Sequence, residues 1–171
     1  VYAITGGSGH YCALITSSKF GACWGFGGDG RIGDNALSNR NAPVSLAAPL
    51  SSVALTKISA GDQHSCAIRA SDGVGFCWGS NGNGRLGDNT TTQRQIPTQI
   101  RGILDGVALS WISAGTSHTC AIRASDSAAF CWGLNTNGQL GDGTTNQALI
   151  PVAVLSPLNG SVDVIEASRS F

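Results

Sequence analysis

The sequence repeats itself every 54 residues, and this period limits the fold more than any other feature of the chain. Cysteines fall at positions 12 and 23, then 66 and 77, then 120 and 131. About 32 of 54 positions are identical between residues 53–106 and 107–160. A period of this length is typical of solenoids and propellers, in which each copy buries its apolar surface only against neighbouring copies.

Other residue types keep the same period. The repeated aromatic and imidazole side chains, which we expect to form the structural core of each copy, are Trp24, Trp78, Trp132, His10, His64 and His118. We therefore expect four units: 1–52, a first copy without its opening residues; 53–106; 107–160; and 161–171, the start of a fourth copy. Because such copies would leave two outer faces uncovered, we expect the 171 residues to be part of a larger whole rather than a closed monomer.

Each copy is predicted to contain four short β-strands. In the second copy the apolar stretches Val53–Ala60, His64–Ala70 and Val74–Trp78 predict three of them, and the last strand is expected near Ile96–Ile100. Pro97 places this last strand at an edge of the sheet, since proline cannot donate a ladder hydrogen bond. The predicted fold class is therefore all-β, with four-stranded antiparallel repeats.

The residues Ser71-Asp72-Gly73 predict a hairpin turn between the second and third strands. A turn centred on Ser71 and Asp72 pairs Cys66 with Cys77, so both cysteines lie on one face of the sheet. Both faces of this hairpin are mostly apolar. We therefore expect each sheet to be covered on both sides, as a propeller blade is by its two neighbours.

Two long segments of the second copy and one of the third carry a family resemblance. Ile58-Ser-Ala-Gly-Asp-Gln-His-Ser-Cys-Ala-Ile, Phe76-Cys-Trp-Gly-Ser-Asn-Gly-Asn-Gly-Arg-Leu-Gly-Asp-Asn-Thr and Cys131-Trp-Gly-Leu-Asn-Thr-Asn-Gly-Gln-Leu-Gly-Asp-Gly-Thr-Thr resemble the RCC1 repeat. The resemblance implies β-propeller blades. Propellers of this family typically have seven blades, so three copies imply a partial or open propeller. The resemblance implies no single activity, since members include a nucleotide-exchange factor, a β-lactamase inhibitor and plant receptor ectodomains.

The cysteine pairs are the strongest chemical signal. Cysteines that face each other on antiparallel strands can adopt disulfide geometry. We expect three bridges, Cys12–Cys23, Cys66–Cys77 and Cys120–Cys131, and the alternative is six reduced thiols buried as small apolar side chains. Disulfides persist in oxidising compartments, so we expect an extracellular or cell-surface protein, with the periplasm as the alternative.

No residue set in the sequence favours a metal, a cofactor or catalysis. His64, Cys66 and Cys77 lack the paired spacing of a structural zinc site, and we expect each repeated histidine to bond a backbone group within its own copy. Every notable Ser, His and Asp recurs with the period, whereas an active site is expected once. We predict no enzyme activity and no cofactor. Asn89 and Asn159 lie in glycosylation sequons.

Charge and the length of apolar runs argue against two partner classes. Ten basic and ten acidic residues give a formal net charge of zero, so we expect no nucleic-acid binding. The sequence has no run of 18 apolar residues, so we expect no membrane insertion. The favoured function is a non-enzymatic extracellular propeller module that binds or adheres to a protein or glycan. The first alternative is a structural subunit of an extracellular fibre or assembly that self-associates through its terminal blade edges. A small-GTPase regulator is the second.

Overall fold

A computed structural model describes residues 1–155 and 162–168. Twelve strands form three antiparallel sheets, each with its four strands in sequence order. The first sheet holds β1 (Ala3–Gly6), β2 (His10–Leu14), β3 (Gly21–Gly25) and β4 (Arg40–Ser45); the second holds β5 (Leu55–Ala60), β6 (His64–Arg69), β7 (Gly75–Gly79) and β8 (Arg94–Gln99). A short 3-10 helix, η1 (Gly102–Leu104), precedes the third sheet, which holds β9 (Leu109–Ala114), β10 (His118–Arg123), β11 (Ala129–Gly133) and β12 (Ala148–Ala153).

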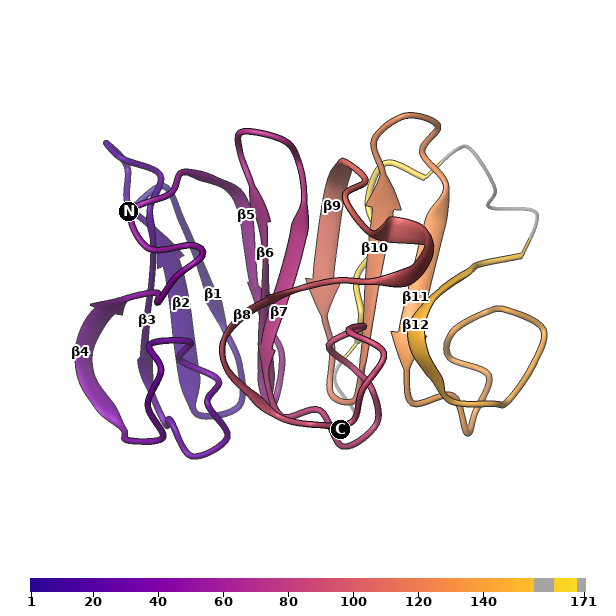
Figure 1. Ribbon diagram of the computed structural model, residues 1–171, viewed down its shortest axis with the longest axis horizontal. Helices are drawn as coiled ribbons and strands as arrows, with labels where there is room; N and C mark the ends of the chain where they lie inside the picture. Colours follow the sequence, from indigo (N-terminus) through magenta and orange to yellow (C-terminus); the bar gives the residue numbers. More distant parts are fainter. Residues whose placement is uncertain (156–161, 169–171) are drawn as a thin grey trace.

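The three sheets stand side by side along the long axis of the molecule, as Figure 1 shows. The first strands of the three sheets, β1, β5 and β9, form one side of the row, and β4, β8 and β12 form the other. The described sheets do not close into a ring. The fold is therefore an open propeller of RCC1-like blades, as the sequence predicts.

The predicted hairpin register is confirmed. Cys66 faces Cys77, and the neighbouring pairs of β6 and β7 follow the same register. The turn forms because Gly73 adopts a positive φ of 73°, which glycine reaches without steric cost. Asp72 closes it by accepting a hydrogen bond from the Val74 N–H at 3.2 Å and by pairing with Arg69. The prediction that Pro97 lies in an edge strand is also confirmed, because β8 ends its sheet.

The strand boundaries differ from the prediction by one or two residues. β5 begins at Leu55 rather than Val53, because the Val53 N–H bonds the Leu50 carbonyl in a turn. β8 covers Arg94–Gln99 rather than starting near Ile96, since an irregularity in the β7–β8 ladder pairs Arg94 with Gly79. Hydrophobic runs indicate where a strand lies, but turns and bulges decide where it ends.

The core lies between the sheets. One face of the second sheet, with Phe76 and Trp78, packs on the first sheet around Ile32 and the Cys12–Cys23 pair. Its other face, with Ile68 and the Cys66–Cys77 pair, packs on the third sheet. Both faces of the middle sheet are thus buried, as expected from the apolar character of both faces of its hairpin.

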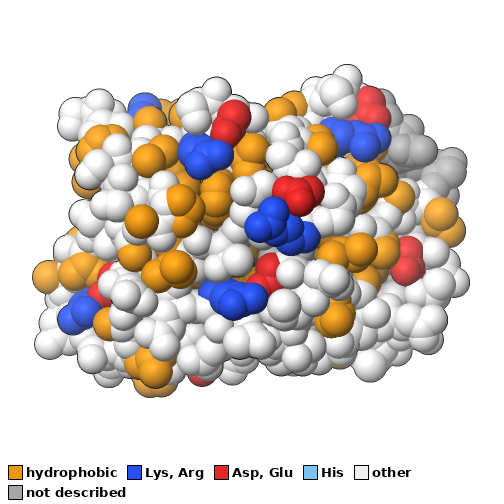
Figure 2. Space-filling view, viewed as in Figure 1, with side chains coloured by type: hydrophobic (Ala, Val, Ile, Leu, Met, Phe, Trp, Pro, Cys, Tyr) orange, Lys and Arg blue, Asp and Glu red, His pale blue; other side chains and the backbone are white. Residues whose placement is uncertain are grey.

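Charged side chains lie at the surface in small groups of opposite sign. Among the described residues the ion pairs include Arg69–Asp72, Arg123–Asp126 and Arg101–Asp105, all at exposed or partly exposed positions. Figure 2 shows basic and acidic side chains next to each other on one face of the molecule, without a continuous basic area there.

Candidate functional site

The six cysteines form three disulfides that link β2 to β3, β6 to β7 and β10 to β11. They are Cys12–Cys23, Cys66–Cys77 and Cys120–Cys131, and the described residues contain no free cysteine. All six side chains are buried. Each bridge therefore joins the two central strands of its sheet, where it stiffens the framework.

The tryptophans lie where neighbouring sheets meet. Trp78 and Trp132 are fully buried, and each donates its indole N–H to a main-chain oxygen of the preceding sheet, that of Arg31 at 3.0 Å and of Arg85 at 2.9 Å. Trp24 holds the equivalent position in the first sheet but is only partly buried. It stacks on Tyr11, with the ring centroids 5.9 Å apart.

His10 and His64 also join neighbouring sheets, which differs from the expectation of a backbone partner in the same copy. His10 Nε2 lies 2.8 Å from the Ser65 hydroxyl of the second sheet, and His64 Nε2 lies 2.8 Å from the Thr119 hydroxyl of the third. Burial, followed by the positive charges of nearby Arg85 and other basic groups, holds the pKa of His64 well below its ordinary value. His64 is therefore neutral at physiological pH, as a structural group between sheets needs to be.

The Gly- and Asn-rich loops are held by their own side chains. The Asn81 side chain donates to Asp88 and to main-chain oxygens, and it accepts from the Leu86 N–H at 3.0 Å. Burial raises the pKa of Asp88, but hydrogen bonds from Thr90, Arg94 and Asn81 outweigh it, so this pKa lies below its ordinary value. Within residues 1–155 and 162–168 no cluster of His, Cys, Asp and Glu could hold a metal ion.

The two sequon asparagines lie outside the sheets. Asn89 is exposed in the loop between β7 and β8, with a φ of 63°. Asn159 lies outside the described residues. Glycosylation at either position stays a prediction.

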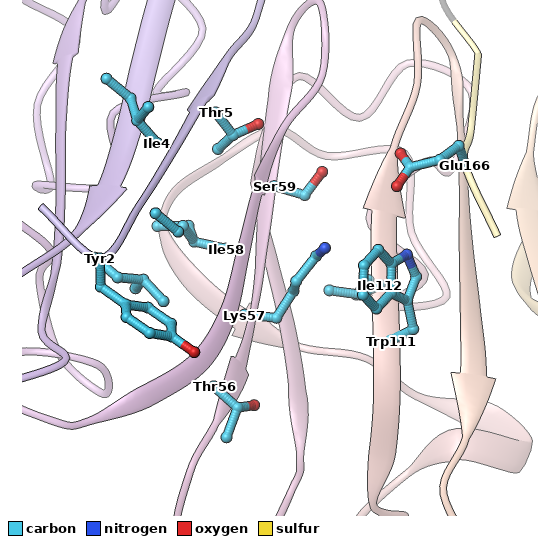
Figure 3. A pocket seen from close by; sticks show the side chains of 12 residues that line it. Tyr2, Ile4, Thr5, Thr56, Lys57, Ile58, Ser59, Trp111, Ile112 and Glu166 are labelled. Carbon is cyan, nitrogen blue, oxygen red and sulfur yellow. The ribbon is translucent and has the colours of Figure 1, made fainter. Parts of the chain in front are cut away.

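A hollow of about 400 Å³ lies along the side of the row formed by β1, β5 and β9. Figure 3 shows its lining: Lys57 from β5 extends toward Trp111 on β9, and the Glu166 carboxylate lies beyond the indole. We call this the inner hollow. Its polar and aromatic lining residues are Tyr2, Thr5, Thr56, Lys57, Ser59, Trp111 and Glu166.

Lys57 and Trp111 form the centre of the inner hollow. The Lys57 ammonium lies over the indole, 3.0 Å from the ring centroid, and the Trp111 N–H donates to the Ile165 carbonyl at 2.8 Å. Partial burial lowers the pKa of Lys57, and the negative charge of Glu166 offsets this in part. Among the described residues no carboxylate lies within 4.0 Å of the ammonium, which keeps donors available for an acceptor from outside.

Sequence reasoning did not single out Lys57, Trp111 or Glu166. Lys57 and Trp111 occupy the same repeat position in two copies, and the first copy has Ala3 there. The sequence signal that could have identified them is that this repeat position carries a different residue in each copy. The framework positions carry the same residues in each copy, whereas this one position in the lining of the inner hollow carries three unlike side chains.

Comparison with known protein families gives matches over most of the chain. The regulator of chromosome condensation (RCC1) repeat matches residues 23–68, 72–122 and 126–170, and a second description of the same repeat matches 55–85 and 112–139. The chain is 31% identical to the ultraviolet-B receptor UVR8 of Arabidopsis thaliana over 156 residues, which cover 91% of this chain and 34% of UVR8. It is 32% identical to the human probable E3 ubiquitin-protein ligase HERC4 over 158 residues, 91% of this chain and 14% of HERC4.

Solved structures agree with this fold. The complex of Kap60 with yeast RCC1 (Prp20) matches with a TM-score of 0.77 at 22% identity, over 91% of this chain and 37% of that one. Prp20p of Saccharomyces cerevisiae, studied with its binding to Gsp1p and histones, matches with a TM-score of 0.72 at 22% identity. This match covers 91% of this chain and 38% of the Prp20p chain. The chain thus spans at most about a third of the curated relatives named above. Within the described residues no helix is long and apolar enough to cross a membrane.

Proposed function

Because the chain belongs to the RCC1 repeat family, we propose that it is a non-enzymatic, extracellular protein-binding module whose contact surface is the inner hollow. The observation that carries this proposal is the Lys57–Trp111 pair, which departs from the repeat inside a partly enclosed hollow. The three buried disulfides support an oxidising compartment. The ligase activity named for HERC4 is not carried over, since the chain covers 14% of that protein.

The chemistry of the inner hollow favours a peptide with an acidic side chain. The Lys57 ammonium has three N–H donors, and one of its sides rests on the Trp111 ring. A carboxylate or main-chain carbonyl from a partner would satisfy the remaining donors, and the Ser59 and Thr5 side chains line the same hollow. The glycan alternative is less favoured here, because the indole face that a sugar ring would stack on is covered by the ammonium.

Panning a displayed peptide library against the disulfide-intact chain tests the proposal. We expect selected peptides to be enriched in Asp and Glu, and to lose about tenfold or more in affinity toward Lys57→Met, which keeps the aliphatic stem and removes the charge. Glu166→Gln should bind the same peptides more tightly, because it removes a competing negative charge. Ile103→Ser, at an exposed site on η1, is the matched control.

Two results would contradict the proposal. One is a peptide set without acidic enrichment that binds wild type and Lys57→Met equally. The other is selective binding on a glycan array that Lys57→Met does not change, which would assign the hollow to a sugar ligand instead.

A further inference from the structure

One repeat position on the first strands faces the edge of the segment that follows in the row. On β9 this position is Trp111, whose indole N–H donates to the Ile165 carbonyl at 2.8 Å. Ile165 corresponds to Ile58 in the repeat, and the position of Trp111 is held by Lys57 on β5 and by Ala3 on β1. The Ala3 side chain is a methyl group without a donor, so it gives the Ile58 carbonyl no such hydrogen bond.

The main-chain N–H and C=O of Ile58 point away from β6, the strand that β5 pairs with. In an antiparallel ladder, successive residues face the neighbouring strand alternately. The Gly61 N–H faces β6, because it bonds the His64 carbonyl, whereas the Ala60 N–H faces the other way and bonds the Thr5 hydroxyl at 3.2 Å. Ile58 lies two residues before Ala60 in a regular part of the register and has the same orientation. The open edge of β5 therefore presents one donor and one acceptor at Ile58.

This edge lies in the inner hollow, between a positive charge and a hydroxyl group. Ile58 is among the lining residues, and Lys57 and Ser59 precede and follow it on β5. Both flanking side chains face the third sheet, since the Lys57 ammonium lies over Trp111 and the Ser59 Oγ accepts the Ala114 N–H at 3.0 Å. Figure 3 shows β5 between the side chains of the first sheet and Trp111 of the third. The middle sheet thus supplies main-chain and charged groups to one site.

We propose that the partner peptide binds as an added strand, antiparallel to β5, whose main chain exchanges two hydrogen bonds with Ile58 and whose following residue is an Asp or Glu beside Lys57. The inference rests on the proposed function and adds the way in which the acidic peptide is held. Extended peptides commonly bind to an open sheet edge through main-chain hydrogen bonds, with side chains giving specificity. The antiparallel arrangement is the more stable per residue, and it gives both bonds of Ile58 to a single peptide residue.

The register fixes where each peptide side chain lies. The residue after the one paired with Ile58 is opposite Lys57, and its side chain is on the side of the sheet that faces Trp111, so a carboxylate there reaches the ammonium. The paired residue itself faces the first sheet, where Ile4 and Thr5 line the hollow, so we expect a small side chain. The volume of about 400 Å³ limits the paired segment to a few residues.

N-methyl scanning of a selected acidic peptide tests this binding mode. A methyl group on the nitrogen of the residue before the acidic one removes the N–H that bonds the Ile58 carbonyl, so affinity for the disulfide-intact chain should fall about tenfold or more. A methyl group on the nitrogen of the acidic residue is the matched control. That N–H points away from β5, so affinity should change by less than about twofold. Isothermal titration calorimetry measures both.

Amide hydrogen exchange in the protein gives a second readout. The Ile58 amide should exchange at least about tenfold more slowly when the peptide is saturating, because its N–H then donates to the added strand. Ile112 holds the same repeat position on β9, which gains no strand, so its exchange should not change.

Similar affinities for the two methylated peptides overturn strand addition, and so does an Ile58 amide that the peptide does not protect. If such peptides still lose affinity toward Lys57→Met, the proposed function stands and only the binding mode is wrong. Peptides that show the expected N-methyl pattern but bind wild type and Lys57→Met equally support pairing with β5 and contradict the charge recognition of the proposed function. The two proposals therefore fail independently.

Discussion

Trp78 of the second sheet donates its indole N–H to the main-chain oxygen of Arg31 in the first sheet, at 3.0 Å. The ring is fully buried, and the contact recurs between Trp132 and Arg85. The same side chain therefore buries apolar surface and satisfies a main-chain oxygen across the boundary between sheets. This contact makes neighbouring sheets stabilise one another.

Replacing Trp78 with alanine should cost about 3–5 kcal/mol of unfolding free energy, because it opens a cavity at the boundary between two sheets and leaves the Arg31 carbonyl without this donor. Trp24→Ala is the matched control, since Trp24 holds the same repeat position but is only partly buried. It should cost about 1 kcal/mol. Urea unfolding of the two variants measures both values, and equal losses would show that Trp78 does not couple the sheets.

The His64 contact predicts that stability falls as the medium becomes acidic. The pKa of His64 is well below its ordinary value in the folded chain, so the unfolded chain binds the proton first. Unfolding free energy should therefore be fully retained above about pH 6.5 and fall below it, by up to about 1.4 kcal/mol per pH unit from this group. His64→Gln, whose amide can still bond Thr119, should flatten the slope between pH 6.5 and 5. If the pH dependence of unfolding free energy is unchanged in this variant, groups other than His64 cause it.

The hydrogen bonds of Asn81 predict that its replacement lowers the unfolding free energy, and that one further substitution restores part of this stability. Asn81→Gly copies the first sheet, where Gly27 stands at this position, and it should cost about 1–3 kcal/mol by removing the bonds to Asp88 and the Leu86 N–H. In the first sheet the Asn39 side chain bonds the Gly27 N–H at 3.1 Å instead. Adding Gln93→Asn, at the position of Asn39, should therefore recover part of the loss. No recovery would indicate that the two loops are held differently.

The strand pairing within one copy and the burial of both sheet faces between copies could be predicted from the sequence, whereas the individual side-chain partners across two copies could not. The Cys66–Cys77 pairing follows from the turn residues and from the alternation of side chains along two adjacent strands. The partner of His64 is a hydroxyl 55 residues later in the chain, which no pattern inside one copy indicates. The prediction of a backbone partner was wrong for that reason.

The candidate site was not predicted because the 54-residue period identifies residues that the copies share, and the site residues are not shared. Lys57 and Trp111 lie at one repeat position and meet only because β5 and β9 are neighbours on the same side of the row. Glu166 completes the inner hollow from residues 162–168, which lie beside β9 through the Trp111–Ile165 and Ser113–Glu166 hydrogen bonds. Under the proposed function, positions that differ between copies are therefore the guide to the binding residues of this chain.

The central claim, an oxidised binding module with a framework of disulfide-linked blades, is tested most directly by peptide mapping of the native protein without reduction. The account predicts that each cysteine is linked to the one eleven residues away, giving Cys12–Cys23, Cys66–Cys77 and Cys120–Cys131. Six thiols that react with an alkylating reagent once the protein is unfolded without reductant would contradict it. That result would remove the support for both the framework and the extracellular location.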